Sequence, residues 1–228
     1  MSMEEYDFFR IPTVDDPRGN LSFLQKGIIP FDPTGVAVND IISDNGLLIA
    51  LHGKCLLKDE GVMLDNPARG FSYQHRPEVI PSSPAGITLN LFERQRIIDS
   101  PKEDSEPWKK TIIEDPVIDT PFHIKRTYYI WKIPEGAVRG GHSHFRQEVL
   151  IVALRGKMRV MLDDSVRRQG ITLDKPTEAL YVAPQVWRSM DSFENGCVVL
   201  VLSSTAYDPS DYVYDYELFK RLVARKKK

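Results

Sequence analysis

Residues 139–144 read "RGGHSH", and the two histidines of this stretch, His142 and His144, are one residue apart. Alternate residues of a β-strand point to the same face, so both imidazoles would project together from a strand. Such a pair can occupy two positions of a metal site or move protons near neutral pH. It can also be two polar residues at the start of a strand, so the surrounding residues have to decide.

A metal site of the β-barrel cupin type needs a glutamate and a third histidine besides the His pair. In that superfamily six residues separate the glutamate from the glycine that follows it, and counting back from Gly156 gives Val149. Glu148 is one residue away, and a shift by one residue turns a strand side chain to the opposite face. The later segment "APQVWR" has Arg188 where the third histidine belongs, and a guanidinium repels a dication. The sequence therefore predicts no bound metal.

Without a metal, an inward-facing histidine is suited to proton transfer. Three arginines of the same strands or loops can bind phosphate oxygens through paired hydrogen bonds: Arg126, Arg139 and Arg188. Aromatic side chains that can stack on a base or a sugar lie in the same region: Tyr128, Tyr129, Trp131 and Trp187. Gly140 and Gly141 let the backbone bend before the histidine strand. This combination predicts a pocket for a polar, anionic substrate.

The elements that position these residues are mostly strands. Runs such as "TYYIWKI", "VLIVAL", "MRVML" and "CVVLVLSS" alternate with Gly, Pro, Asn and Asp, which is typical of a β-sandwich or barrel. Only the end, "SDYVYDYELFKRLVAR", has a helical pattern. We expect Ser210 and Asp211 to cap this helix and Leu218, Leu222 and Val223 to form its apolar stripe.

The two halves of the chain share short segments in the same order. "IALHGK" parallels "VALRGK", "LDNP" parallels "LDKP", and "GITLNLF" parallels "GCVVLVL". This order favours an internal duplication in which the first copy lacks the interval that carries the His pair. We predict a degenerate N-terminal cupin-like domain over residues 1–98, a linker over 99–116 and a catalytic domain over 117–228.

The overall composition excludes several classes of protein. With 228 residues, of which 42% are hydrophobic, the chain can bury a sizeable core. A net charge of −2 provides no basic field for nucleic acid, and the longest apolar run, "VLIVAL", is too short to cross a bilayer. The first residues lack the features of a signal peptide, and neither Cys55 nor Cys197 has a CxxC partner. We expect a reduced cytoplasmic protein without nucleic-acid or membrane partners.

The C-terminal half resembles the dTDP-sugar 3,4-ketoisomerases, the WxcM-like cupin family. The resemblance covers roughly residues 117–222. Its matching segments are "PFHIKRTYYI" (121–130), "RGGHSH" (139–144), "LIVALRGKMRVMLDD" (150–164), "LDKPTEALYVAPQVWRSM" (173–190) and "VLVLSSTAYDPSDYVYDYELF" (199–219).

This resemblance implies an all-β fold, the double-stranded β-helix or jelly roll of cupins. The duplication and the helical C-terminal pattern add the expectation of a tandem bicupin with a short C-terminal helix, although tandem cupins are unusual for this family. It implies an isomerase, without metal or other cofactor, in deoxyamino-sugar biosynthesis. The substrate would be a dTDP-linked 4-keto-6-deoxyhexose, whose keto group moves from C4 to C3 through an enediol. Members of this family typically form homodimers, so the resemblance also implies a homodimer. The first copy either replaces the dimer partner or adds to one.

The resemblance assigns roles to single residues as well. His142 would be the proton-shuttling base, assisted by His144 and Tyr129. From their residue types, we expect Arg126, Arg139, Trp187 and Arg188 to bind the substrate. The segment "DDPRGNLSF" (15–23) is similar to the family's first strand but heads the first copy. Arg18 in this segment either completes the C-terminal site or is a relic, and we favour the relic.

Three rival functions remain open. A cupin 3(,5)-epimerase would act on the same substrate but leave the carbonyl at C4. A bicupin without catalytic activity would bind a nucleotide-sugar and not convert it. A metal cupin, of the dioxygenase or mannose-phosphate isomerase type, would depend on a bound ion.

Overall fold

A computed structural model describes residues 6–11, 13–25, 35–38, 46–52, 55–57, 62–64, 69–73, 79–81, 87–92, 106–113, 118 and 120–226. Within these residues the protein is built from antiparallel strands with one α-helix near the C-terminal end. The predicted all-β class is therefore confirmed. No helix of the described part is long and apolar enough to cross a membrane.

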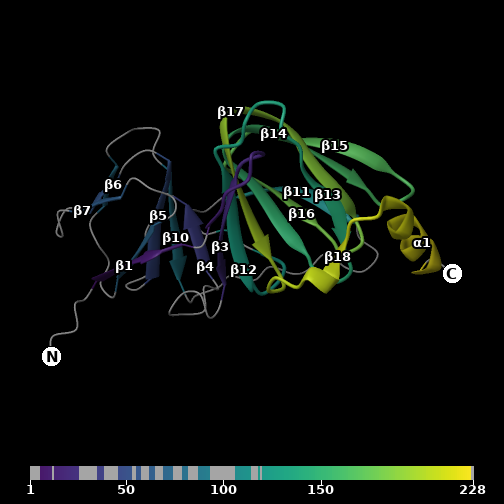
Figure 1. Ribbon diagram of the computed structural model, residues 1–228, viewed down its shortest axis with the longest axis horizontal. Helices are drawn as coiled ribbons and strands as arrows, with labels where there is room; N and C mark the ends of the chain where they lie inside the picture. Colours follow the sequence, from purple (N-terminus) through teal and green to yellow (C-terminus); the bar gives the residue numbers. More distant parts are fainter. Residues whose placement is uncertain are drawn as a thin grey trace.

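The strands that the structure describes form three sheets. The five-stranded sheet consists of β1 (Tyr6–Arg10), β8 (Arg69–Tyr73), β5 (Gly46–His52), β10 (Ile87–Phe92) and β4 (Gly35–Val38), in that spatial order. The three-stranded sheet consists of β7 (Val62–Leu64), β6 (Cys55–Leu57) and β9 (Val79–Pro81). The remaining strands form one ten-stranded sheet that curls into a barrel (Figure 1).

The barrel sheet has the central path β11-β16-β14-β17-β12-β3-β2. Its strands are β2 (Thr13–Val14), β3 (Asn20–Gln25), β11 (Trp108–Ile112), β12 (Arg126–Trp131), β13 (Arg139–His144), β14 (Val149–Asp163), β15 (Arg168–Leu173), β16 (Glu178–Val182), β17 (Trp187–Ser203) and β18 (Tyr212–Val213). The long strands β14 and β17 pair along most of their length, with register shifts between Ala153 and Arg159. Such bulges bend paired strands, which lets them contribute to more than one side of the barrel.

Two apolar clusters lie on opposite faces of the barrel sheet. The inner cluster includes Ile130, Ile151 and Val201, from β12, β14 and β17. The outer cluster includes Tyr129 and Trp131 of β12, together with Ile11, Leu24 and Ile49 from the N-terminal part of the chain. Successive residues of β12 thus enter opposite cores, as the two-residue period of a strand requires.

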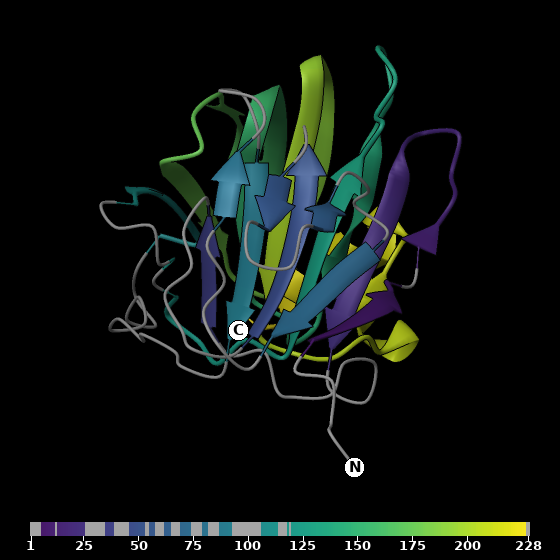
Figure 2. The same ribbon diagram turned by 90° about the vertical axis from the view of Figure 1, so that its left-hand side faces the viewer.

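The N-terminal sheet covers the outer face of the barrel. Figures 1 and 2 show its strands beside the barrel sheet, and Ile49 of β5 is completely buried in the outer cluster. The boundaries differ from the predicted ones in two places. The hairpin β2–β3 belongs to the barrel, because β3 pairs with β12 over Asn20–Gln25. The second half of the predicted linker contains β11, which pairs with β16, whereas residues 99–105 lie outside the described part.

The C-terminal helix α1 (Tyr216–Lys226) begins later than predicted. Asp215 caps it, since its carboxylate accepts a hydrogen bond from the Leu218 amide at 2.9 Å. Ser210 and Asp211 instead belong to a 3-10 turn, Pro209–Asp211, and Asp211 is buried. The buried side of α1 is formed by Phe219 and Val223, whereas Leu218 is exposed.

Candidate active site

A cavity of about 480 Å³ lies inside the barrel, between the strand β13 that carries "RGGHSH" and the strands β12 and β17. Of the seven predicted site residues, four line it: Arg126, Arg139, His142 and Arg188. The cavity is also lined by Arg18, whose role the sequence left open, and by Tyr128, one of the aromatic residues expected to stack on the substrate. Three further tyrosines without a predicted role line it as well: Tyr207, Tyr212 and Tyr214. The volume is in the range of small-molecule sites.

Two glycines bring His142 close to Arg188. Strand β13 pairs with β17 so that His142 lies opposite Arg188, with an irregular register after Gly140. Gly140 and Gly141 have φ of +80° and +75°, in the left-handed region that favours glycine. A Cβ on Gly140 would lie 2.9 Å from the backbone oxygen of Arg188, so only glycine permits this approach.

His142 is a neutral imidazole at the wall of the cavity. Burial lowers its pKa to about 3, and the positive charge of Arg188 acts in the same direction. A backbone hydrogen bond with Gly140 opposes this shift. The ring is therefore unprotonated near neutral pH and available as a base.

His144 lies behind His142 and does not line the cavity. Its side chain is about 1% exposed, and its Nδ1 is 3.2 Å from the Asp211 carboxylate. Burial and the nearby Arg188 lower its pKa, so this ring is also neutral. The rings of His142 and His144 meet edge to face, with centroids 4.9 Å apart.

Arg188 offers unsatisfied donors to the cavity. Its side chain is buried, and neither terminal nitrogen has an acceptor in good hydrogen-bond geometry among the described residues. Burial lowers its pKa, but a guanidinium starts so high that it stays protonated. The Tyr128 side chain is close enough to oppose the lowering of the Arg188 pKa. Buried donors without partners are costly, so this group is suited to an oxyanion or a carbonyl oxygen of a ligand.

The other arginines contact aromatic and acidic side chains. Arg126 stacks on Tyr128, with Cζ 4.6 Å from the ring centroid. Arg139 is 3.1 Å from the Asp16 carboxylate, which also binds Arg18 at 2.8 Å. These two arginines hold the pKa of Asp16 well below its usual range, mainly through hydrogen bonds from Arg18. Arg18 also lines the cavity, so its position favours a contribution to the C-terminal site over the relic that we expected.

Two predicted site residues lie elsewhere. Tyr129 is completely buried in the outer cluster, and its hydroxyl is hydrogen-bonded to Ser22. Its neighbour Tyr128 faces the cavity instead, because adjacent strand residues face opposite sides. Trp187 packs on α1, with its ring centroid 5.1 Å from that of Tyr216, and lines a separate cavity of about 240 Å³.

Some of the missed residues left a signal in the sequence. Tyr128 shares its strand with the chosen Tyr129, so the pair could have been treated as alternatives. Tyr212 and Tyr214 belong to the segment "YDPSDYVYDY", which carried the resemblance without any assigned role. Tyr207 is the first residue of the same segment, and its ring lies 5.1 Å from the guanidinium of Arg126 at the cavity.

The donor groups near His142 do not form a metal-binding set. In the described part of the chain, no three His, Cys, Asp or Glu side chains are grouped so that they could hold an ion. Glu148 turns to the other side of the sheet, where it accepts a hydrogen bond from the Tyr181 hydroxyl at 2.8 Å. Tyr181 belongs to the outer cluster, as the one-residue shift of Glu148 leads one to expect.

The curled ten-stranded sheet and its polar internal cavity define a protein of the cupin class. Residues 94–224 match the family described as "FdtA: WxcM-like, C-terminal", and the chain belongs to this family. The predicted family is thereby confirmed.

Two relatives indicate the kind of enzyme in this family. TDP-4-oxo-6-deoxy-alpha-D-glucose-3,4-oxoisomerase of Aneurinibacillus thermoaerophilus is 46% identical over 105 residues, which cover 46% of this chain and 76% of that protein. A mutant of the 3,4-ketoisomerase QdtA from Thermoanaerobacterium thermosaccharolyticum was solved in complex with TDP-4-keto-6-deoxyglucose. It is 30% identical, with a TM-score of 0.51, and the match covers 54% of this chain and 97% of QdtA. The predicted class of enzyme, an isomerase, is confirmed by both.

Proposed function

We propose that this protein is a 3,4-ketoisomerase that moves the carbonyl of a dTDP-linked 4-keto-6-deoxyhexose from C4 to C3. The family and its two relatives support this reaction. The observation that carries the proposal is the neutral ring of His142 beside the unsatisfied guanidinium of Arg188 in one cavity. A base and an oxyanion-stabilising group at the same carbon centre are what an enolisation needs.

In the proposed reaction, His142 removes the proton at C3, which the C4 ketone has made acidic. The electron pair forms a C3–C4 double bond, and the carbonyl oxygen becomes an enediolate oxygen held by Arg188. A hydroxyl proton then passes from O3 to O4, for which Tyr128 and Tyr212 offer hydroxyl groups at the cavity. The imidazolium of His142 returns its proton to C4, so no proton is gained or lost overall.

Substrate binding would increase the basicity of His142. In the free protein, the pKa of His142 is lowered partly by the charge of Arg188. A bound diphosphate brings negative charge to the cavity, where Arg126, Arg139 and Arg18 can meet it. An added anion raises the pKa of a nearby imidazole, which brings the base closer to the working pH.

The decisive experiment is NMR of the product after incubating metal-stripped protein with dTDP-4-keto-6-deoxyglucose in D₂O. We expect a 3-keto sugar that carries deuterium at C4 to the extent that the imidazolium of His142 exchanges its proton with solvent before returning it. The variant His142→Ala should lose this activity, and circular dichroism should show that it remains folded. Full activity of that variant would contradict the assignment of His142 as the base.

The other outcomes of the same experiment separate the rival functions. Deuterium at C3 or C5 with the carbonyl still at C4 would indicate an epimerase. Tight binding without conversion would indicate a binding protein. Activity that returns only when a divalent ion is added back would indicate a metal cupin, against the proposal that the protein needs no cofactor.

A further inference from the structure

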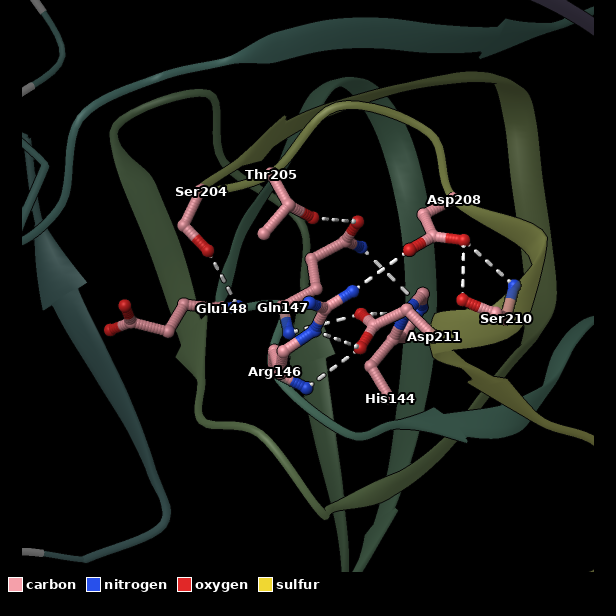
Figure 3. A network of polar contacts seen from close by, with 9 residues as sticks. All are labelled: His144, Arg146, Gln147, Glu148, Ser204, Thr205, Asp208, Ser210 and Asp211. Carbon is pink, nitrogen blue, oxygen red and sulfur yellow. Dashed lines mark hydrogen bonds and ion pairs between the residues drawn. The ribbon is translucent and has the colours of Figure 1, made fainter.

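A buried carboxylate lies behind the His pair. Asp211 is 3% exposed, and its Oδ1 and Oδ2 accept hydrogen bonds from the backbone amides of Arg146 and Gln147, at 2.9 and 3.1 Å. The Nε of Arg146 approaches Oδ1 at 3.4 Å. The remaining neighbour of Oδ2 is Nδ1 of His144, at 3.2 Å (Figure 3). The carboxylate is thus held by the backbone and directed at one imidazole nitrogen.

The hydrogen bonds around His144 form a chain in which each group donates to the next. The Thr205 hydroxyl is 3.1 Å from Oε1 of Gln147 and donates to it. The amide NH₂ of Gln147 therefore points to Nε2 of His144, 3.4 Å away, so this nitrogen accepts (Figure 3). A neutral imidazole carries one proton, which must then be on Nδ1, where it is donated to Asp211. The chain of donors is Thr205, Gln147, His144, and Asp211 is its final acceptor.

This chain of contacts reaches His142 through packing. The ring of His144 meets the ring of His142 edge to face, at an angle of 81°. Tyr212, the residue after Asp211, packs on both rings, with centroids 4.1 Å from His144 and 5.0 Å from His142. Strand β18 also pairs with β13, so that Tyr212 lies opposite His144. The position of the His142 ring thus depends on groups that Asp211 holds.

We propose that Asp211 is a positioning residue: it fixes the Nδ1–H tautomer of His144, and through this ring it orients the base His142 toward the substrate. The proposal rests on the proposed function, since His142 is the base only in that reaction. Neither Asp211 nor His144 lines the cavity, so neither is a catalytic residue. A carboxylate that orients a histidine in this way is a general means of fixing its tautomer.

The variant Asp211→Asn tests the tautomer directly. The asparagine oxygen should take the place of Oδ1, because there it accepts from the backbone N–H and the Nε of Arg146. Its NH₂ then takes the place of Oδ2, where it faces Nδ1 of His144 and the backbone N–H of Gln147. The imidazole proton then moves to Nε2, where it opposes the NH₂ of Gln147. We expect kcat to fall on the order of 10- to 100-fold, with KM changed less than about twofold, because the base is misoriented while the arginines still bind substrate.

A second substitution should repair this conflict. In the double variant Asp211→Asn/Gln147→Glu, the new carboxylate of residue 147 accepts from Nε2–H of His144 and can still accept from Thr205. The number of buried charges is unchanged, and the direction of the contacts is reversed. We expect most of the lost kcat to return. Failure of the second substitution to restore kcat, in a folded protein, would overturn the proposal.

The matched control is Asp208→Asn. Asp208 lies on the same turn and binds Arg146 at 2.8 Å, but it has no contact with His144 (Figure 3). Its kinetics should equal those of the unaltered protein. A loss as large as that of Asp211→Asn would mean that the turn matters only as an anchor, which would overturn the positioning role.

Imidazole ¹⁵N chemical shifts give a readout that does not depend on activity. Signals of His144 are assigned by their absence in His144→Gln. We expect Nδ1–H in the unaltered protein and Nε2–H in Asp211→Asn, and an unchanged tautomer would overturn the proposal. If the unaltered protein converts no 4-keto sugar, the proposed function fails, while the tautomers still decide whether Asp211 controls His144.

Discussion

His142 is a neutral histidine that faces a cavity lined by arginines. Its pKa is lowered to about 3 by burial and by Arg188, whereas in the unfolded chain it has the ordinary value near 6.5. Between these two values the unfolded state binds more protons than the folded state. Stability is therefore complete above pH 6.5 and is lost as the pH falls toward 3.

We predict that replacing His142 with glutamine makes the unfolding free energy less dependent on pH. Below pH 6.5, protonation of His142 in the unfolded chain should lower the unfolding free energy by about 1.4 kcal/mol for each pH unit. The variant should lack this contribution to the slope. His144 acts in the same direction and remains in both proteins. Urea unfolding between pH 7 and pH 5 measures the difference, and parallel profiles of the two proteins would contradict the lowered pKa.

The neighbouring tyrosines of β12 should behave oppositely. Tyr128→Phe removes a hydroxyl at the cavity. We expect kcat to fall about 100-fold, the lower end of the range for the loss of a proton-transfer group. Tyr129→Phe removes only the hydrogen bond with Ser22 in the outer core, which should cost about 1 kcal/mol of stability and leave kcat unchanged. Steady-state kinetics and thermal unfolding of both variants test this, and a larger loss of kcat in Tyr129→Phe would reverse the assignment.

At the scale of elements, strand β13 is shaped by its two glycines, which have unequal surroundings. Both have positive φ, so alanine at either position should cost about 1–2 kcal/mol. A Cβ at Gly140 would in addition press on the backbone of Arg188, whereas at Gly141 there is nothing within 4 Å. We predict that Gly140→Ala is more destabilising than Gly141→Ala, by about 1–3 kcal/mol.

Gly140→Ala and Gly141→Ala should also differ in kcat. Displacing the backbone of Arg188 moves a group opposite His142, so Gly140→Ala should also lower kcat. Gly141→Ala serves as the matched control for the strain of positive φ alone. Equal stabilities and equal kcat values in the two variants would show that the close approach of β13 to β17 is not important.

At the scale of the whole molecule, the N-terminal half contributes to the stability of the barrel. Strand β3 pairs with β12, and Ile11, Leu24 and Ile49 are completely buried against the barrel's outer face. Without these groups, the fragment 106–228 would expose an apolar face and an unpaired strand edge. Exposed surfaces of this kind favour aggregation.

We predict that the fragment 106–228 binds a hydrophobic dye, aggregates and unfolds at a lower temperature than the full chain. Arg18→Ala in the full chain is the control, because Arg18 is largely exposed and its ion pair contributes little stability. That variant should unfold like the unaltered protein and differ mainly in KM. A fragment as soluble and as stable as the full chain would contradict a structural role of the N-terminal half. The homodimer remains a prediction, which light scattering of the full chain would test.

Much of the site could be predicted because its signals are local. The spacing of His142 and His144 and the nearby glycines lie within one strand, and Arg188 occupies a recognisable motif position. The orientation of Tyr128 and Tyr129 could not be predicted in this way. Alternation requires that they face opposite sides, but which side is the cavity depends on the pairing of β12 with β3 and β17.

By itself, the sequence determined the all-β class, the family and the His pair, since these follow from local patterns of hydrophobicity and residue type. The tertiary structure decided that Asp211 faces His144 rather than capping a helix, and that Arg18 reaches the cavity from a distant hairpin. Both depend on pairing between strands far apart in the chain. That pairing is fixed by how the whole molecule buries its apolar faces and satisfies its hydrogen bonds, and not by the residues nearby in sequence.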